Sequence, residues 1–352
     1  MKKIVCGLLM AASCALLPVW AADTVDVLSQ KALAGTQALG AVLLDVTPAG
    51  ARLVAVGERG VVLLSDDNGQ HWRQAVSPVS TTLTAVQFAD ASNGWAVGHS
   101  GVVLHSNDGG ESWQLQLDGK QAAALELKAA ERTDDARRIA AAQRLLADGA
   151  DKPLLAMSFA DARHGIVLGA YGLALITRDG GTSWQSLMGT LPNPRGLHLY
   201  AVARQGDEVV IAGEQGLLLR SINGGRTFDA LKGPYEGSYF ATTLLPNGRM
   251  LVGGLRGTLF ASDDGGQSFQ SVNNPVPASL NALRIASKHL LAVNQAGMLM
   301  RSALTDLHLQ PIGVSEGLPL TAVTEAADGA LVTVGMGGPR RLAPFSPNTI
   351  AD

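Results

Sequence analysis

Short polar side chains recur along this chain in one fixed pattern, Ser/Thr-x-Asp/Asn-x-Gly-x-x-Trp/Phe. Aligned carboxylates are what acid–base catalysis would require. In every copy, however, the acid or amide lies between a hydroxyl residue and a glycine, which is typical of a tight turn. We therefore interpret the motif as a structural turn whose aromatic residue packs between neighbouring units. Its five copies are Ser65, Asp67, Gly69, Trp72; Ser106, Asp108, Gly110, Trp113; Thr177, Asp179, Gly181, Trp184; Ser221, Asn223, Gly225, Phe228; and Ser262, Asp264, Gly266, Phe269.

Other residue patterns give little support to a catalytic or metal site. The chain has 7 histidines, none at metal-ligand spacing from another, and it contains neither HExxH nor CxxC. The run from Gly313 to Gly317 matches GxSxG. A nucleophile elbow needs a strand before it and a helix after it, whereas this run falls in a loop between two units. We expect no catalytic residue, no metal and no cofactor.

Glycine turns show how the repeated motif is arranged. A Gly-x-x-Gly turn precedes each copy by one short apolar strand, and its second glycine or an equivalent one also marks two later units. Units of about 40 residues, each with several short strands, are typical of a β-propeller with four-stranded blades. The sequence therefore predicts an all-β, seven-bladed β-propeller over residues 22–352. The turn glycines are Gly60, Gly101, Gly172, Gly216, Gly257, Gly297 and Gly338.

One unit carries an insertion of about 30 residues, from Gly119 to Lys152, rich in helix-forming residues. We expect a helical hairpin within the propeller, with Thr133 as the N-cap of its second helix. Its apolar face could fold over the channel mouth as a lid, or it could be presented to a partner. The last unit lacks an outer strand, which we expect Thr24 to Leu28 to supply.

The first residues have the form of a secretory signal peptide, residues 1–21. Lys2 and Lys3 precede an apolar run, and cleavage is expected after Ala21. The mature chain would then be periplasmic or otherwise exported and would contain no cysteine; lipidation at Cys14 is the less favoured alternative. It would carry 25 Lys and Arg against 30 Asp and Glu, a formal charge of −5. This acidic balance argues against nucleic-acid binding.

The repeated motif is the Asp-box, also called the bacterial neuraminidase repeat. Together with the Val-Gly-x-x-Gly turns and seven units, it resembles the photosystem II stability/assembly factor family of exported propellers, over residues 40 to 340. The resemblance implies a non-catalytic scaffold or assembly factor that contacts a membrane-protein complex or its subunits. In photosynthetic relatives it implies a role in photosystem II biogenesis. We expect a monomer without nucleic acid or small-molecule cofactor.

The Asp-box is also found in sialidases, so a glycan-binding or glycan-cleaving propeller is the alternative. Its nearest candidate residues are Arg195, Tyr200, Tyr235, Glu236 and Tyr239, but the N-terminal Arg-Ile-Pro-type motif of sialidases is absent. The favoured hypothesis is a partner-binding face made by the Gly-x-x-Gly turns and the links between blades, because tyrosine and arginine are enriched in interface hot spots. Its candidates are Arg59, His99, Tyr171, Arg195, His198, Tyr200, Glu214, Tyr235, Tyr239 and Arg256.

Overall fold

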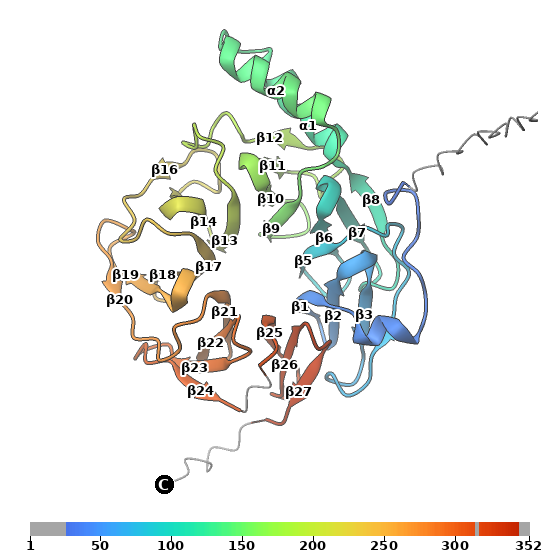
Figure 1. The fold of residues 1–352 in the computed structure, drawn as a ribbon, viewed down its shortest axis with the longest axis vertical. Helices are drawn as coiled ribbons and strands as arrows, with labels where there is room; N and C mark the ends of the chain where they lie inside the picture. The colour runs from blue at the N-terminus through green and yellow to red at the C-terminus, as the bar shows by residue number, and fades with distance from the viewer. Residues whose placement is uncertain (1–25, 314–316, 345–352) are drawn as a thin grey trace, which may run out of the picture.

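The computed structural model describes residues 26–313 and 317–344. They form seven antiparallel sheets arranged around a central channel (Figure 1), which confirms the seven-bladed propeller. The leader, Cys14 and Ser315 of the GxSxG match lie outside the described residues. None of the helices in the described ranges is long and apolar enough to cross a membrane.

The strands follow each other in chain order from the channel to the rim. Blades 1 to 3 contain β1 (Leu43–Ala49), β2 (Arg52–Gly57), β3 (Val62–Ser65) and β4 (Arg73–Gln74); β5 (Leu83–Phe88), β6 (Gly94–Gly98), β7 (Val103–Ser106) and β8 (Gln114–Leu117); and β9 (Leu154–Phe159), β10 (Gly165–Gly169), β11 (Ala174–Thr177) and β12 (Gln185–Ser186). Blades 4 and 5 contain β13 (Leu199–Gln205), β14 (Glu208–Gly213), β15 (Leu218–Ser221) and β16 (Asp229–Ala230); and β17 (Tyr239–Leu244), β18 (Met250–Gly254), β19 (Leu259–Ser262) and β20 (Gln270–Ser271). Blades 6 and 7 contain β21 (Leu280–Ala286), β22 (His289–Asn294), β23 (Leu299–Ala303) and β24 (Gln310–Ile312); and β25 (Leu320–Glu325), β26 (Leu331–Gly335) and β27 (Arg340–Leu342).

The Gly-x-x-Gly turn joins the second and third strands of a blade, and each glycine has its own reason. In blade 1 a Cβ on Gly57 would lie 2.1 Å from the carbonyl oxygen of Val42, so only glycine permits this approach to the inner strand. Arg59 and Gly60 then take φ values of 54° and 73°. Two successive positive φ values match the right-handed twist of the strands. The turn therefore presents the Arg59 side chain outward.

The hydrogen bonds of the Asp-box explain its residue types. In blade 2 the hydroxyl of Ser106 donates to Asp108 (2.7 Å) and accepts from the N–H of Gly110 (2.9 Å). Asp108 also accepts from the N–H of Ser112 (3.0 Å). Trp113 closes the turn by donating from its indole N–H to the carbonyl of Gly110 (3.0 Å). Each polar group of the motif therefore serves the turn itself.

The aromatic residue of the motif packs between blades. Trp113 of blade 2 lies in one buried cluster with Val54 and Leu64 of blade 1, and its ring meets Phe88 edge to face at 5.9 Å. A Cβ on Gly110 would approach Leu64 to 3.2 Å, so the turn itself is pressed against the preceding blade. The motif therefore builds the blade boundary as well as the hairpin.

Inner strands are also joined directly to the following blade. Thr84, at the bulge of β5, donates its hydroxyl to the carbonyl of Leu154 in blade 3 (2.7 Å). Gln87 pairs with both backbone groups of Phe159, accepting from its N–H at 2.9 Å and donating to its carbonyl at 3.0 Å. Blades 2 and 3 are therefore joined by side-chain hydrogen bonds near the axis of the ring.

Closure of the ring differs from the prediction. Residues from Asp26 to Ser29 form a turn, and the carbonyl of Val27 accepts from the N–H of Ser80 in the link between blades 1 and 2 (2.9 Å). The prediction that Thr24 to Leu28 completes the last blade is therefore wrong; Thr24 itself lies outside the described residues. A short apolar run can bury its side chains at several sites, and Leu28 packs against the core between blades 1 and 2. Blade 7 has three strands within the described residues.

A short helix, η1 (Thr36–Gly40), covers the boundary between blades 7 and 1 instead. Ala38 and Ala41 are buried there with Leu43 of blade 1 and Val334 of blade 7. Across the same boundary Thr321 donates to the carbonyl of Leu43 (2.8 Å). The first and last blades are therefore held together by packing and side-chain hydrogen bonds.

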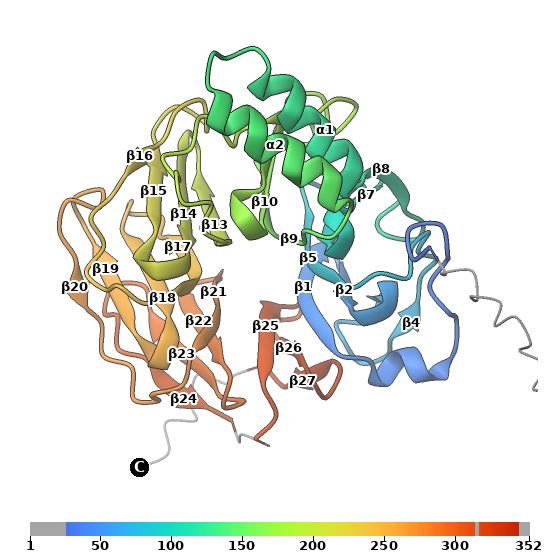
Figure 2. The ribbon, with the colours of Figure 1, turned by 45° about the horizontal axis from the view of Figure 1, so that its top comes forward.

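The insertion forms α1 (Gly119–Ala130) and α2 (Ala136–Asp148), which confirms the helical hairpin within the propeller. Figures 1 and 2 show both helices at the rim, with α1 beside β12 and away from the central channel, so the lid interpretation is wrong. The N-cap of α2 is Asp135, which accepts from the N–H groups of Arg137 and Arg138. Thr133 donates instead to the carbonyl of Ala130 (2.6 Å), closing α1.

Replacing Trp113 with Ala should destabilise the propeller by about 3–5 kcal/mol, because a large aromatic leaves a packed boundary. Leu115→Ala is the matched control. Leu115 is exposed on β8, the outer strand that directly follows Trp113, so its replacement should change the free energy of unfolding by no more than about 0.5 kcal/mol. Urea unfolding measures both. Equal effects of the two substitutions would contradict this account of the boundary.

The Asp-box carboxylates should make stability depend on acid pH. The hydroxyl and then the N–H of Ser268 lower the pKa of Asp264 from its ordinary 3.8 to about 2. Because the folded-state pKa is below that of the unfolded chain, this stabilisation is complete above about pH 4 and is lost as the pH falls towards 2.

Asp264→Asn should therefore keep stability at pH 7 and lose less between pH 4 and pH 2 than the unmodified protein. Asn223 shows that the amide fits the turn, since its amide nitrogen donates to the hydroxyl of Thr227 (2.8 Å). The reciprocal variant, Asn223→Asp, should steepen the acid dependence. Urea unfolding at pH 7, 4 and 2.5 measures it, and identical slopes for all three proteins would refute the assignment.

Candidate interaction face

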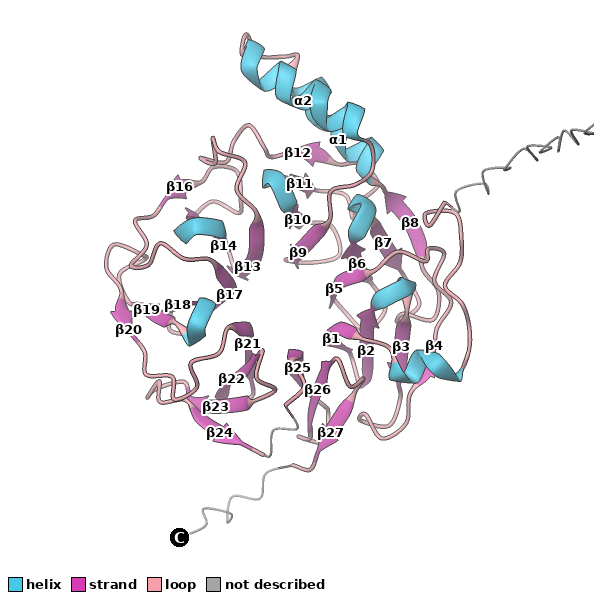
Figure 3. Cartoon of the chain, viewed as in Figure 1, coloured by secondary structure: helices cyan, strands magenta, loops and turns pink. Residues whose placement is uncertain are grey.

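One face of the ring carries the Gly-x-x-Gly turns and the links between blades; we call it the turn face. Figure 3 shows its short helical turns around the channel. They are η2 (Glu58–Gly60), η3 (His99–Gly101), η4 (Ala170–Gly172), η5 (Glu214–Gly216) and η6 (Leu255–Gly257). Arg59, His99 and Arg256 are exposed on three different turns, in blades 1, 2 and 5. The fold places them on one face without bringing them together.

Several other candidates do meet, where blade 3 passes to blade 4. Tyr171 has a positive φ of 56° and is 58% exposed. Its ring meets that of His198 edge to face at 4.8 Å, and His198 meets Tyr200 at 5.9 Å. Tyr200 in turn lies 5.1 Å from Phe240 of blade 5. These four rings form a continuous row from the exposed turn face to the channel, which we call the aromatic row.

The backbone holds the aromatic row in position. His198 accepts the N–H of Tyr171 at its Nδ1 (2.8 Å), so a neutral ring carries its proton on Nε2. The N–H of His198 donates to the carboxylate of Glu214 (3.1 Å). Burial, and then the charge of Glu214, raise the pKa of Tyr200, which therefore stays a neutral phenol.

Cationic groups flank the aromatic row. The ammonium of Lys152 lies 5.0 Å from the centre of the Tyr171 ring, at cation–π distance. Arg195, on the link before β13, donates to the side chain of Gln215 (2.8 Å). Lys152 is already paired with Asp148 (3.1 Å) and Asp151 (2.6 Å). The arrangement therefore offers an exposed phenol, a half-buried second one and the guanidinium of Arg195, which suits the recognition of a polypeptide surface.

The remaining two tyrosines belong mainly to the core. Tyr235 lies 6.1 Å from Tyr239, whose ring is fully buried. The hydroxyl of Tyr239 donates to the carbonyl of Tyr235 (3.2 Å), and burial raises the pKa of Tyr239 to about 12. The inclusion of Tyr239 among the partner-binding candidates is therefore corrected, because strand β17 turns its side chain inward. The same burial makes it unsuitable as a glycosidase nucleophile.

Sequence reasoning missed Lys152 and Phe240, although Phe240 directly follows Tyr239. Side chains alternate along a strand, so the neighbour of a buried ring faces the other way. It also missed Asp45 and Arg284, which meet at the channel. The position of Asp45 in the inner strand is alanine in the six other blades. This departure from the repeat was the feature of the sequence that could have indicated the site.

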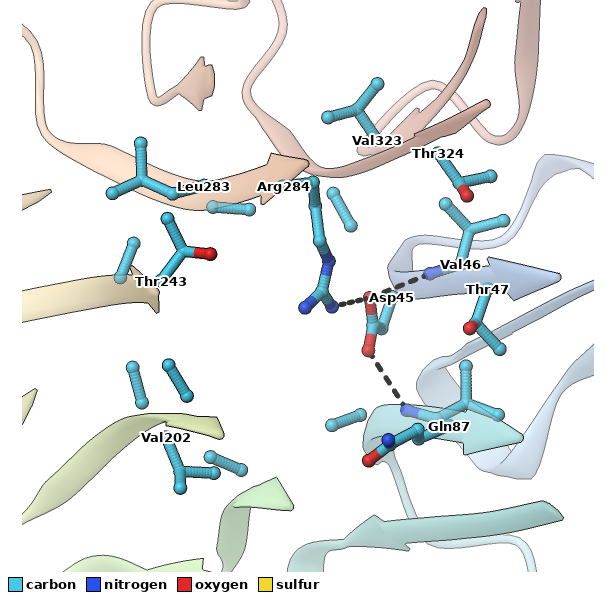
Figure 4. A pocket seen from close by; sticks show the side chains of 18 of the residues that line it. Asp45, Val46, Thr47, Gln87, Val202, Thr243, Leu283, Arg284, Val323 and Thr324 are labelled. Carbon is cyan, nitrogen blue, oxygen red and sulfur yellow. Dashed lines mark hydrogen bonds and ion pairs between the residues drawn. The ribbon is translucent and has the colours of Figure 1, made fainter. Parts of the chain in front are cut away.

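The channel has a volume of about 680 Å³ and is lined by the seven inner strands. Figure 4 shows Arg284 of β21 reaching Asp45 of β1, with 3.1 Å between guanidinium and carboxylate. Asp45 is buried and also accepts from the N–H groups of Val46 (2.9 Å) and Val86 (3.0 Å). Within the described ranges no group of three or more side chains is arranged to hold a metal ion.

The helical hairpin is attached to blade 3 through a buried carboxylate. Glu126 of α1 is 3% exposed, accepts from Arg138 of α2 at 2.9 and 3.1 Å, and takes a hydrogen bond from Ser186 of β12. The guanidinium of Arg138 packs against Gly189, since a Cβ on Gly189 would lie only 2.1 Å from it. One acid thus joins both helices to the propeller.

Comparison with known proteins agrees with the fold and the repeat. The sequence model described as "Photosynthesis system II assembly factor YCF48" matches residues 68–153 and 137–234. The photosystem II assembly lipoprotein Ycf48 of Synechococcus sp. (strain CC9902) is 33% identical over 98 residues, which are 28% of this chain and 27% of that protein. The alignment thus spans about a quarter of that relative's length.

Two solved structures share the whole fold. The structure described as YCF48 bound to D1 peptide has a TM-score of 0.64 at 18% identity, over 88% of this chain and 95% of that one. YCF48 from Cyanidioschyzon merolae has a TM-score of 0.63 at 15% identity, over 91% and 99% of the two chains. The protein is a seven-bladed Asp-box propeller. Its resemblance to the photosystem II assembly factor family is confirmed.

Replacing Glu126 with Ala should loosen the hairpin, because Arg138 then remains in a mostly buried place without its acid. Removal of one partner of a buried pair costs about 3–5 kcal/mol, and the partial exposure of Arg138 favours the lower end. Hydrogen exchange over residues 119–148 should rise, whereas Glu131→Ala, on the exposed end of α1, should leave it unchanged. Unaltered exchange in Glu126→Ala would contradict the attachment.

Proposed function

We propose that this protein is an exported, non-catalytic scaffold that assists the assembly of a membrane-protein complex by binding one of its subunits. The resemblance to the assembly factor family supports the class of function. In a photosynthetic host the complex would be photosystem II. Export follows from the leader, expected at residues 1–21, and the periplasm is the proposed compartment; the relative from Synechococcus is itself described as a lipoprotein.

The aromatic row is the observation that carries the proposal. Tyr171 is largely exposed although its backbone is in a conformation that few side chains adopt, and its ring contacts that of His198 and lies at cation–π distance from Lys152. A rigid aromatic side chain loses little conformational entropy on binding, so it suits an interface anchor. We assign the subunit contact to this part of the turn face, with Arg195, His198, Tyr200 and Glu214 beside Tyr171, and Arg59, His99, Tyr235 and Arg256 further around the ring.

A non-catalytic role agrees with the chemistry of the described residues. The Asp-box carboxylates are committed to their own turns, and Tyr200 and Tyr239 both have raised pKa values that oppose formation of a nucleophilic phenolate. The solved relative bound to D1 peptide shows that a related propeller can hold a polypeptide segment. We extend this to the present chain: its ligand is a polypeptide of the client complex, bound by a propeller that acts as a monomer.

Replacing Tyr171 with Ala should reduce co-purification of the client subunit from the organism's own membranes about 30-fold, the effect of losing a 2 kcal/mol hot spot. Ile222→Ala is the matched control, since Ile222 is 68% exposed but lies in an Asp-box turn on the opposite face. It should leave recovery unchanged, as measured by quantitative mass spectrometry. Equal recovery with both variants would contradict the assignment of the turn face.

A further inference from the structure

His198 holds the turn of Tyr171 through a hydrogen bond that recurs at other blade boundaries. The backbone N–H of Tyr171 donates to Nδ1 of His198 (2.8 Å), across the boundary between blades 3 and 4. At the next two boundaries the equivalent N–H donates to a serine hydroxyl at 3.4 Å, and the pairs are Gln215 with Ser238 and Arg256 with Ser279. A hydroxyl accepts at any ordinary pH, whereas an imidazole nitrogen ceases to accept when it takes up a proton. The bond at His198 is therefore the titratable member of this set of three.

Protonation of His198 would set two donors against each other. A neutral imidazole that accepts at Nδ1 carries its proton on Nε2, so the next proton must go to Nδ1. The new N–H would then face the N–H of Tyr171 at a distance that only a hydrogen bond permits, and the imidazole would have to move. The ring of Tyr171 packs edge to face against the same imidazole at 4.8 Å. Movement of His198 therefore removes the backbone bond and the ring contact together.

The titratable and charged groups around His198 include an acceptor for the imidazolium. The carboxylate of Glu214, on η5, already accepts the backbone N–H of His198 (3.1 Å). Lys152, before β9, is paired with two aspartates, and Arg195, on the same link as His198, donates to a glutamine. Burial and the charge of Glu214 raise the pKa of Tyr200, which stays a neutral phenol. Glu214 is thus the group that can receive the displaced imidazolium.

The turn itself does not depend on this hydrogen bond. At the boundary between blades 2 and 3 the residue before the inner strand is Pro153, whose side chain cannot accept a hydrogen bond. Ser100, in the turn of blade 2, nevertheless has a φ of 58°, close to the 56° of Tyr171. Loss of the bond should therefore leave blade 3 folded and change only how firmly Tyr171 is held.

We propose that His198 is a pH-sensitive switch for Tyr171 on the turn face. At neutral pH the unprotonated imidazole fixes the exposed phenol for binding, and uptake of a proton in acid releases it. Histidine is the side chain that ordinarily changes its charge between about pH 5 and pH 8. The partner that the switch would release rests on the proposed function, whereas the coupling between the proton and the turn does not.

Selective labelling makes the switch observable, because the chain has only 4 tyrosines. In NMR spectra of the mature protein labelled with ¹⁵N-tyrosine, the amide signal of Tyr171 should shift as the pH falls from 8 to 5. Its protection from solvent exchange should fall about 10-fold, the effect of losing one hydrogen bond. The amides of Tyr235 and Tyr239 are internal controls and should keep their protection.

Two variants separate the switch from a general effect of acid. His198→Asn offers an amide oxygen in place of Nδ1 and does not titrate in this range, so protection of the Tyr171 amide should stay constant. His198→Ser reproduces the hydroxyl acceptor of the next two boundaries and should behave in the same way. A Tyr171 amide that does not respond to pH, or that responds equally in the unmodified protein and both variants, would overturn the proposal.

Recovery of the client subunit from the organism's membranes tests the regulation. Lowering the pH from 7.5 to 5.5 should reduce recovery with the unmodified protein about 5-fold, the effect of having to order one side chain on binding. With His198→Asn the reduction should be less than about 2-fold, and equal reductions would exclude His198 as the regulator. Failure of the proposed function is distinguishable, since Tyr171→Ala would then recover the client normally at pH 7.5 while the Tyr171 amide of the unmodified protein still titrates.

Discussion

The contact between adjacent blades is the interaction on which the rest of this structure depends. A single blade is a small, narrow sheet that cannot bury both of its faces, so it is stable only between neighbours. Trp113 supplies the outer part of such a contact, and the hydrogen bonds from Thr84 and Gln87 supply the part near the axis. Packing thus holds the outer part of the boundary between blades 1 and 2, and polar pairing holds the boundary between blades 2 and 3 near the axis.

The last blade shows what happens where this arrangement is incomplete. Its boundary with blade 1 is covered by η1 and fastened by Thr321, and Arg341 adds bonds to the carbonyl of Asn68 (3.0 Å) and to Asp328 (2.6 Å). Its boundary with blade 6 retains a cavity. Side chains of blade 6 nevertheless bond to blade 7, from Asn281 to the carbonyl of Leu320 (2.7 Å) and from Ser287 to Glu325 (2.7 Å), so blade 7 is fastened on both sides.

The turn face acquires its chemistry from the same backbone rules that make the blades. A turn with two successive positive φ values needs glycine only at its second position here, and the first displays a side chain to solvent. In blade 3 that side chain is Tyr171. A residue that contributes little to folding is thereby available for binding, and the rigid turn beneath it limits the entropy lost when a partner is bound.

Much of the architecture was determined by the sequence alone. The number of blades, the order of strands and the role of each turn glycine follow from short-range spacing, because a hairpin is specified by residues that are close in the chain. The helical insertion was visible for the same reason. Sequence spacing also predicted which segments lie on the candidate interaction face, since all Gly-x-x-Gly turns open on one side of the ring.

Tertiary structure alone decided which side chains meet. Asp45 and Arg284 are separated by 239 positions and become partners only because the ring closes. Tyr239 and Tyr171 have the same chemistry, yet one is fully buried and the other largely exposed, since the side chain's direction depends on strand register and neighbouring blades. The position of Val27 could not be predicted from the sequence either, because the apolar residues beside it could have been buried against more than one blade. Local spacing specifies a repeat, whereas contacts between distant repeats depend on packing that no single repeat encodes.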